Sequence, residues 1–188
     1  SFTGGPILDA LERRYGARAA RPLYCSVDPE LYFPDATASA HWDLGYMGTY
    51  SDDRQPPLTR LMLDAARAWP AGAFVLAGPQ YRGTIAWPDN VQRIEHLAPA
   101  EHRRFYCAQR FTLNITRAAM VRTGYAPSVR LFEAAACAVP VISDSWAGLG
   151  EFFAIGSELL VAESAEDTLR YLREVPEDER REVGARAR

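Results

Sequence analysis

The sequence predicts an α/β protein in which a Rossmann-like parallel sheet carries helices on both faces. Short apolar runs alternate with amphipathic stretches from residue 22 onward, which is the pattern of buried parallel strands joined by helices. The chain has 188 residues, of which 48% are hydrophobic. That length and composition suit one domain with a sizeable core, with or without an extra arm.

Six or seven strands are expected, because each apolar run is short and is bounded by polar or turn-forming residues. In chain order the runs are Leu23–Tyr24, Leu44–Met47, Phe74–Ala77, Val91–Ile94, Phe111–Ile115, Val139–Ser143 and Leu159–Val161.

Helices are expected between these runs. Apolar residues recur at helical spacing from Leu58 to Trp69 and again around Phe105, and Ser164 with Asp167 forms a pair typical of a helix start. Strand–helix–strand connections are right-handed, so the carboxyl ends of the strands meet at one edge, where ligands of this fold bind. The residues expected at that edge are Gly48–Tyr50, Gly78–Pro79, Glu95–His96, Asn114–Arg117 and Asp144–Gly148.

Three segments are predicted along the chain. Residues 1–40 form a linker, because two prolines and the polar residues 35–39 indicate a connecting loop. Residues 41–175 form the Rossmann-like domain. Residues 176–188 form a C-terminal helix with Glu and Arg pairs.

Composition excludes several classes of function. A net charge of −3, from 21 basic and 24 acidic residues, gives no basic field, so nucleic acid is not an expected partner. Cys25, Cys107 and Cys137 have neither disulfide-framework nor metal-ligand spacing, and no metal is expected. No apolar run approaches the ~20 residues that cross a bilayer. A cytoplasmic protein without a transmembrane segment is therefore expected.

The most informative stretch is residues 124–151, where a small-residue turn, a helix with one Glu and a buried strand follow without spacing. Ser128 fits the N-cap, with its hydroxyl bonded to a backbone N–H of the first turn. The remaining N–H groups, on Val129 and Arg130, are then available to a phosphate at the positive end of the helix dipole. Glu133 lies one and a half turns further along, near whatever is attached to that phosphate.

The same stretch resembles the donor-binding core of retaining GT-B glycosyltransferases. The family pattern runs Glu, a Gly-rich turn, Pro, a second Glu, Ala-x-Ala-x-Gly-x-Pro-Val-Ile and then Gly-Leu-x-Glu. Here it reads Pro127, Glu133-Ala134-Ala135-Ala136-Cys137-Ala138-Val139-Pro140-Val141-Ile142 and Gly148-Leu149-Gly150-Glu151. The likeness is greatest to the group-1 subfamily that includes spore-maturation-type glycosyltransferases, and it covers most of residues 22–175.

A GT-B enzyme has two domains, and the resemblance implies that this chain holds the second, donor-binding one. Residues 1–21 would be a remnant of the linker or of the N-terminal domain. Glu133 is implied to accept both ribose hydroxyls of the nucleotide in charge-assisted hydrogen bonds. Glu151 matches a family position near the sugar diphosphate, and His96 lies where the family has its nucleobase pocket.

Some of these residues have alternative readings. Arg130 and Glu151 could be solvent-facing side chains, and His96 could be purely structural. Gly48 opens the loop at the binding edge. Arg117, which is also at that edge, either pairs with phosphate oxygens in a fork geometry or forms a salt bridge with a neighbouring helix.

Two features depart from the family pattern. Many members carry an Arg and a Lys after the first strand of this domain, which stabilise the departing nucleoside diphosphate without a metal. Here the Arg position is Thr49 and the Lys position falls near Arg54, so the predicted catalytic cations are Arg54 and Arg117, with Arg60 as a substitute. The first Glu of the Glu-x7-Glu pattern, which contacts the donor sugar in the family, is replaced by Tyr125.

The predicted function is that of a metal-independent, hexosyltransferase-type donor domain, which binds a nucleotide-diphosphate sugar and needs no further cofactor. The acceptor is unknown, and an N-terminal GT-B domain would complete the active site. The alternatives are a nucleotide-binding module without transferase activity and a non-catalytic interaction domain. A dinucleotide-binding oxidoreductase ranks last, because residues 45–48 do not supply the Gly-x-Gly-x-x-Gly spacing.

Overall fold

The computed structural model describes residues 2–188, so the first residue of the predicted segment 1–40 lies outside the described residues. Six parallel strands form one sheet in the order β3-β2-β1-β4-β5-β6. Their bounds are β1 (Trp42–Met47), β2 (Phe74–Ala77), β3 (Val91–Ile94), β4 (Gln109–Asn114), β5 (Val141–Ser143) and β6 (Leu160–Val161). The predicted Rossmann-like parallel sheet is confirmed.

The predicted strand at Leu23–Tyr24 is wrong. These residues belong to an extended connection, and Leu23 is 80% exposed, because no neighbouring strand pairs with it. The predicted strand Val139–Ser143 is shortened at its start. Pro140 has no N–H to give to the ladder, and its carbonyl accepts the N–H of Thr112 at 3.0 Å just before β5 begins.

Helices and helical turns connect the strands. Between β1 and β2, α2 (Gln55–Leu58) passes through a π-helical turn, η1 (Thr59–Leu63), into α3 (Asp64–Ala68). The other elements are α1 (Pro6–Tyr15), the 3₁₀ turn η2 (Pro99–Glu101), α4 (His102–Cys107), α5 (Ala118–Thr123), α6 (Val129–Ala136), the 3₁₀ turn η3 (Leu149–Glu151), α7 (Ala165–Glu174) and α8 (Glu177–Ala187).

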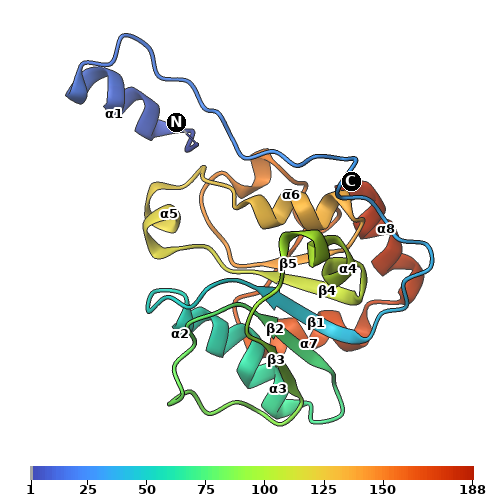
Figure 1. The fold of residues 1–188 in the computed structure, drawn as a ribbon. Coiled ribbons are helices and arrows are strands. Elements are labelled where there is room, and N and C mark those ends of the chain that lie inside the picture. The colour runs from blue at the N-terminus through green and yellow to red at the C-terminus, as the bar shows by residue number, and fades with distance from the viewer. Residues whose placement is uncertain (1) are drawn as a thin grey trace.

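The helices cover both faces of the sheet (Figure 1). On one face, α2, η1, α3 and α7 bury residues such as Leu61 and Leu172 against Tyr46 and Phe111 of the strands. On the other face, α4 and α6 enclose a second core, in which Leu131 packs with Val141. Since both faces are covered, the free surface of the sheet lies at the ends of its strands, and this is where a ligand can enter.

The N-terminal segment lies along the outside of this body. Helix α1 stands apart from the sheet, and the chain then runs past α6 and α8 before it enters β1 (Figure 1). The N–H of Gly4 donates to the carbonyl of Tyr125 at 2.8 Å, which ties the start of the described chain to the turn before α6.

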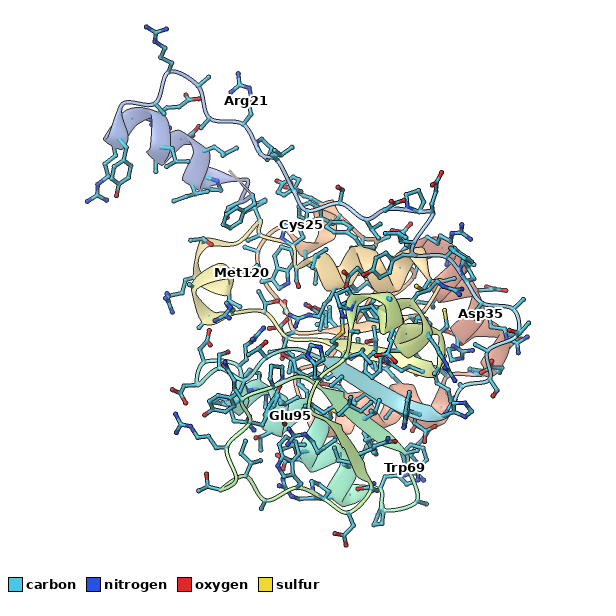
Figure 2. All side chains as sticks on the ribbon, viewed as in Figure 1. Arg21, Cys25, Asp35, Trp69, Glu95 and Met120 are labelled. Carbon is cyan, nitrogen blue, oxygen red and sulfur yellow. The ribbon has the colours of Figure 1, made fainter. Side chains whose placement is uncertain are left out.

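In Figure 2, Met120 on α5 and Trp69 after α3 mark opposite ends of the strands. Among the described residues, no helix has both the length and the apolar character to cross a membrane.

Candidate functional site

An open cavity of about 290 Å³ lies at the carboxyl ends of β1, β2 and β3, beside the first turns of α6. It lies next to the point where the strand order reverses between β1 and β4, which is the usual ligand position in this type of sheet. The lining residues are Met47, Gly48, Thr49, Ala77, Gly78, Pro79, His96, Leu97, His102, Val129, Arg130 and Glu133.

The structure brings most of the predicted binding residues together in this cavity. Gly48, Thr49, His96, Val129, Arg130 and Glu133 all line it. The other predicted residues, Ser128, Glu151, Arg54 and Arg117, are not among its lining residues. Arg54 and Ser128 make hydrogen bonds within the protein near the same edge, whereas Arg117 and Glu151 are exposed.

Glu133 is the buried carboxylate of the cavity. It is 9% exposed, and its Oε2 accepts the hydroxyl of Tyr106 at 2.8 Å. Tyr106 is itself buried on α4, and burial followed by the negative charge of Glu133 raises the pKa of its hydroxyl. The bond fixes the carboxylate, which retains acceptor positions for a ligand because an ionised carboxylate offers about four lone-pair sites.

A second tyrosine faces Glu133 from the linker. Burial and the nearby charge of Glu133 raise the pKa of Tyr32 to about 12, so its hydroxyl keeps its proton and can donate to the carboxylate. The same hydroxyl lies 3.4 Å from Nδ1 of His102 at the start of α4. The linker therefore contributes directly to the surroundings of the site.

The start of α6 differs in one detail from the prediction. Ser128 is the N-cap residue and has extended backbone angles, but its side chain makes no capping hydrogen bond, so the predicted cap bond is wrong. The carbonyl of Ser128 accepts the N–H of Leu131 at 3.1 Å. Since the first N–H groups of a helix have no intrahelical acceptor, those of Val129 and Arg130 are the donors that this end offers to the cavity.

The Arg130 side chain does not face solvent; it bonds to the protein backbone and also lines the cavity. Its guanidinium donates to the carbonyl of Met47 at 2.7 Å and to that of Ile115 at 3.1 Å. It also lies 5.4 Å from the ring centroid of Tyr46. Arg130 thus joins the ends of β1 and β4 and brings a positive charge to the wall of the cavity.

Two glycines allow a close backbone approach at the mouth of the cavity. Gly78 has φ +148°, and a Cβ there would lie 2.1 Å from the carbonyl oxygen of Gly48. A side chain at position 78 would therefore force apart the loops that follow β1 and β2. The sequence pointed to both residues, because each directly follows a buried strand.

Arg54 supports a loop. It is 7% exposed, its Nε donates to Oγ of Ser51 at 2.9 Å, and its Nη2 donates to the carbonyl of Thr49. Burial lowers the pKa of its guanidinium. Arg54 holds the loop between β1 and α2, and in this conformation it does not reach the cavity surface.

Arg117 and Glu151 are exposed at the same edge. Arg117 is the residue before α5, and Glu151 lies in η3. Within residues 2–188, neither side chain takes part in a hydrogen bond or a salt bridge, and the charge of Arg117 acts through space on Asp53.

Tyr125, at the position of the family's first Glu, has a packing role. Its backbone is left-handed, with φ +51°. Its ring lies so close to Gly5 and Gly148 that a Cβ on either glycine would come within 2.4 Å of a ring carbon. The aromatic ring therefore fills the space between the N-terminal segment and the loop after β5.

A larger cavity, of about 550 Å³, opens beside α5 at the ends of β4 and β5. Asp144 lies in its wall and accepts two bonds from Thr116, from the backbone N–H at 2.9 Å and from Oγ1 at 2.8 Å. Burial raises the pKa of the Asp144 carboxyl against the effect of these bonds. Arg60, the predicted substitute cation, lines this cavity and not the smaller one.

Sequence reasoning missed three polar side chains near Glu133, namely Tyr32, Tyr106 and His102. They come from the linker and from α4, and no local motif connects them with α6. Across residues 2–188, no group of three or more His, Cys, Asp or Glu side chains forms a metal-binding arrangement.

The chain is similar to a known protein family and to several solved structures. A family model described as "Glycosyl transferase-like" matches residues 54–188. AviGT4, a glycosyltransferase involved in avilamycin A biosynthesis, has 21% sequence identity and a TM-score of 0.65 over 92% of this chain and 54% of its own. Anabaena HepE in complex with UDP-glucose has 14% identity and a TM-score of 0.69 over 93% of this chain and 53% of its own.

A third similar structure is the C-terminal domain of a group 1 family glycosyl transferase, LpcC from Francisella tularensis. It has 13% identity and a TM-score of 0.62, over 86% of this chain and 94% of that domain. This chain spans about half the length of AviGT4 and of HepE. The curated proteins include no match to the sequence.

Proposed function

Since the chain belongs to the glycosyl transferase-like family and has the Rossmann-like fold of a GT-B glycosyltransferase domain, we propose that it binds a nucleotide-diphosphate sugar. The cavity beside α6 is the proposed donor site, and the proposed reaction is glycosyl transfer to an acceptor that another domain supplies. The observation that carries the proposal is the position of Glu133, a fixed and buried carboxylate that lines an open cavity near a helix start.

Glu133 is the proposed ribose ligand. One carboxylate can accept two adjacent hydroxyls in parallel, and hydrogen bonds to an ionised group are stronger than those between neutral groups. Tyr106 already holds one oxygen in place. A carboxylate that is fixed before the ligand arrives loses less conformational freedom on binding than a mobile one, which favours affinity.

The diphosphate is proposed to lie between the start of α6 and Gly48. The N–H groups of Val129 and Arg130 and the helix dipole favour an anion there, and the guanidinium of Arg130 adds a fixed positive charge in the wall of the cavity. The absence of a side chain on Gly48 leaves room for phosphate oxygens near the backbone. The nucleobase would lie toward His96 and Leu97, after β3.

The leaving diphosphate gains negative charge as the glycosidic bond breaks, and fixed cations lower that barrier. Arg117 is the better candidate for this role, because it is exposed at the binding edge. Arg54 would have to leave its bonds to Thr49 and Ser51 to take part. We therefore propose that Arg54 supports the loop after β1 and that Arg117 contacts the donor.

Several finer parts of the function stay predictions. These are metal independence, the absence of a cofactor beyond the donor, a cytoplasmic location, a role for Glu151 and Ser128 near the diphosphate, and an N-terminal domain that completes the site. The predicted division into residues 1–40, 41–175 and 176–188 also stays a prediction.

Calorimetric titration with UDP, GDP, ADP and dTDP tests the donor site, and UDP comes first because HepE was solved with UDP-glucose. Glu133→Gln keeps an acceptor for Tyr106 but removes the charge, so Kd should rise by about tenfold or more, which corresponds to about 1.4 kcal/mol. Glu174→Ala is the control, because Glu174 is an exposed residue at the end of α7, outside the cavity lining.

An unchanged Kd in folded Glu133→Gln contradicts the ribose role, and no heat with any nucleotide contradicts a complete donor site on this chain. The rival function, a nucleotide-binding module without transferase activity, is distinguished by turnover. Binding without release of nucleoside diphosphate from a nucleotide sugar, even with an acceptor-binding domain added, would favour that rival.

A further inference from the structure

Two cysteines lie close together between α4 and α6, at the C-terminal ends of these helices. Cys107 is the last residue of α4 and Cys137 is the C-cap of α6. Cys107 packs against the buried cluster that contains Cys137, and both residues line a separate cavity of about 500 Å³. The third cysteine, Cys25, is exposed on the linker, and in Figure 2 it lies well apart from Asp35, which lines the cysteine cavity.

The two thiols differ in access and in chemistry. Cys107 is partly exposed, and its Sγ lies 3.8 Å from the carbonyl oxygen of Phe33, whereas Cys137 is buried. The neighbouring Cys137 thiol, then the backbone at Asp35 and the charge of Arg103, lower the pKa of Cys107 to about 7, while the neighbouring Cys107 thiol and burial raise the pKa of Cys137. The other charged groups around the cavity are Asp35, Glu177, Arg180 and Arg181.

This difference determines which of the two thiols reacts first. Because the pKa of Cys107 is lowered, a larger fraction of it than of an ordinary thiol is thiolate at neutral pH. The attacking species in thiol–disulfide exchange is the thiolate. Cys107 is therefore the group that meets a reagent in the cavity, and Cys137 is in position to complete the exchange.

A metal site is a weaker explanation of the pair. Structural zinc takes four ligands, and in the described part of the chain no third His, Cys, Asp or Glu joins these two thiols. Two neighbouring thiols are sufficient, by contrast, for a disulfide.

We propose that Cys107 and Cys137 form a dithiol site that reacts with low-molecular-weight disulfides and closes to an internal disulfide between α4 and α6. The Cys107 thiolate attacks one sulfur of the reagent, forms a mixed disulfide and releases one thiolate, which takes the proton of Cys137. The Cys137 sulfur then attacks the Cys107 sulfur and expels the second thiolate, which takes a proton from water. Two electrons pass from the protein thiols to the reagent, which leaves as two thiols.

The site adjoins the donor cavity through the same two helices. Tyr106 precedes Cys107, and Glu133 lies one turn before Cys137, whose N–H donates to the Glu133 carbonyl at 3.2 Å. The disulfide would run alongside the Tyr106–Glu133 hydrogen bond and hold α4 against α6. The dithiol inference does not depend on the proposed function, because its chemistry is detected without a nucleotide.

The test uses the full chain with Cys25→Ser, which removes the exposed thiol and leaves the core unchanged. The reduced protein is treated with oxidised glutathione, and its intact mass and non-reducing peptide map are measured. We expect both thiols to disappear together, no glutathione to stay bound, and the peptides that contain Cys107 and Cys137 to be linked. Dithiothreitol should restore both thiols.

Two further variants separate the roles. In the same background, Cys137→Ala should retain one glutathione on Cys107, and Cys107→Ala should slow the loss of the Cys137 thiol by at least about tenfold, because Cys137 is buried. If these variants fail to fold, the intact mass and peptide map of the Cys25→Ser protein still test the proposal. A lasting glutathione adduct on Cys107 beside a free Cys137, or no reaction of either thiol, would overturn the proposal.

Discussion

The hydroxyl of Tyr106 donates to Oε2 of Glu133 across 2.8 Å, and both side chains are buried between α4 and α6. The bond joins two helices that are separated along the chain by β4 and α5. It also fixes the one buried carboxylate in the lining of the proposed donor cavity. Its removal therefore bears on both stability and binding.

Tyr106→Phe should lower the free energy of unfolding by ~1.5–3 kcal/mol, because it takes a donor from a charged group in a buried setting. Urea denaturation measures this loss. Tyr171→Phe is the matched control, since the Tyr171 hydroxyl donates to the neutral carbonyl of Val161 at 3.0 Å, and its removal should cost about 1 kcal/mol. A smaller loss for Tyr106→Phe than for Tyr171→Phe would contradict a charge-assisted bond.

Ala138→Gly should stabilise the protein by up to about 1 kcal/mol. Ala138 has φ +54°, a left-handed conformation that costs a residue with a Cβ roughly 1–2 kcal/mol. The greater freedom of glycine in the unfolded chain offsets part of this gain. The family pattern has Gly at this position, which agrees with the backbone angle.

Thermal unfolding checks the sign of the effect. The control is Ala136→Gly, at the last residue of α6, where the same change should destabilise by ~0.5–1 kcal/mol. Destabilisation by both substitutions would show that the left-handed turn carries no strain.

The sequence predicted the sheet well wherever a strand is buried on both sides. Phe74–Ala77, which is buried along its whole length, has the predicted bounds, because a short apolar run between turn residues favours a buried strand. Val91–Ile94 also has the predicted bounds, although it is the edge strand and Gln92 is exposed. Leu23–Tyr24 shows the same local pattern but has no strand beside it. Pairing depends on distant parts of the chain, and a short apolar run does not encode it.

The candidate site was predictable to the extent that it follows the topology. Gly48 and His96 were found because they follow strands, and Glu133 because it occurs in a recognisable motif. The contacts that define the carboxylate's surroundings were not predictable, since Tyr106 and Tyr32 reach it from other elements. The bonds of Arg130 to two strand carbonyls also depend on the folded geometry.

Gly184→Ala should destabilise the protein by ~1–3 kcal/mol, although Ala forms helix better than Gly by about 1 kcal/mol. A Cβ at position 184 would lie 2.2 Å from the carbonyl oxygen of Ala138, so α8 would have to move away from the body. Chemical denaturation measures the change. In the control Gly150→Ala, the nearest atom to the new Cβ, on Ile155, is 3.8 Å away, and the effect should stay within about 0.5 kcal/mol. Equal effects at the two positions would exclude close packing of α8 as the cause.

The contribution of Glu177 to the free energy of unfolding should depend on pH in the acid range. Its hydrogen bonds and ion pairs with Arg180, and secondarily with Arg181, lower the pKa of its carboxyl from 4.5 to about 2. A carboxyl whose pKa is lower in the folded state contributes stability above its unfolded pKa, and loses it as the pH falls through the folded value. The contribution should therefore be complete at neutral pH and decline between pH 4.5 and about 2.

Glu177→Gln is expected to cost about 1 kcal/mol or less at neutral pH, because the Glu177 side chain is 49% exposed and solvent screens the ion pairs. Urea denaturation across this pH range should show the difference from the parent protein shrinking toward zero as Glu177 takes up its proton. The control Glu182→Gln breaks one pair, with Arg186 at 3.0 Å, on the exposed side of α8. A cost of Glu177→Gln that stays constant down to about pH 2 would mean that shape rather than charge holds the start of α8, since only the charged interaction disappears on protonation.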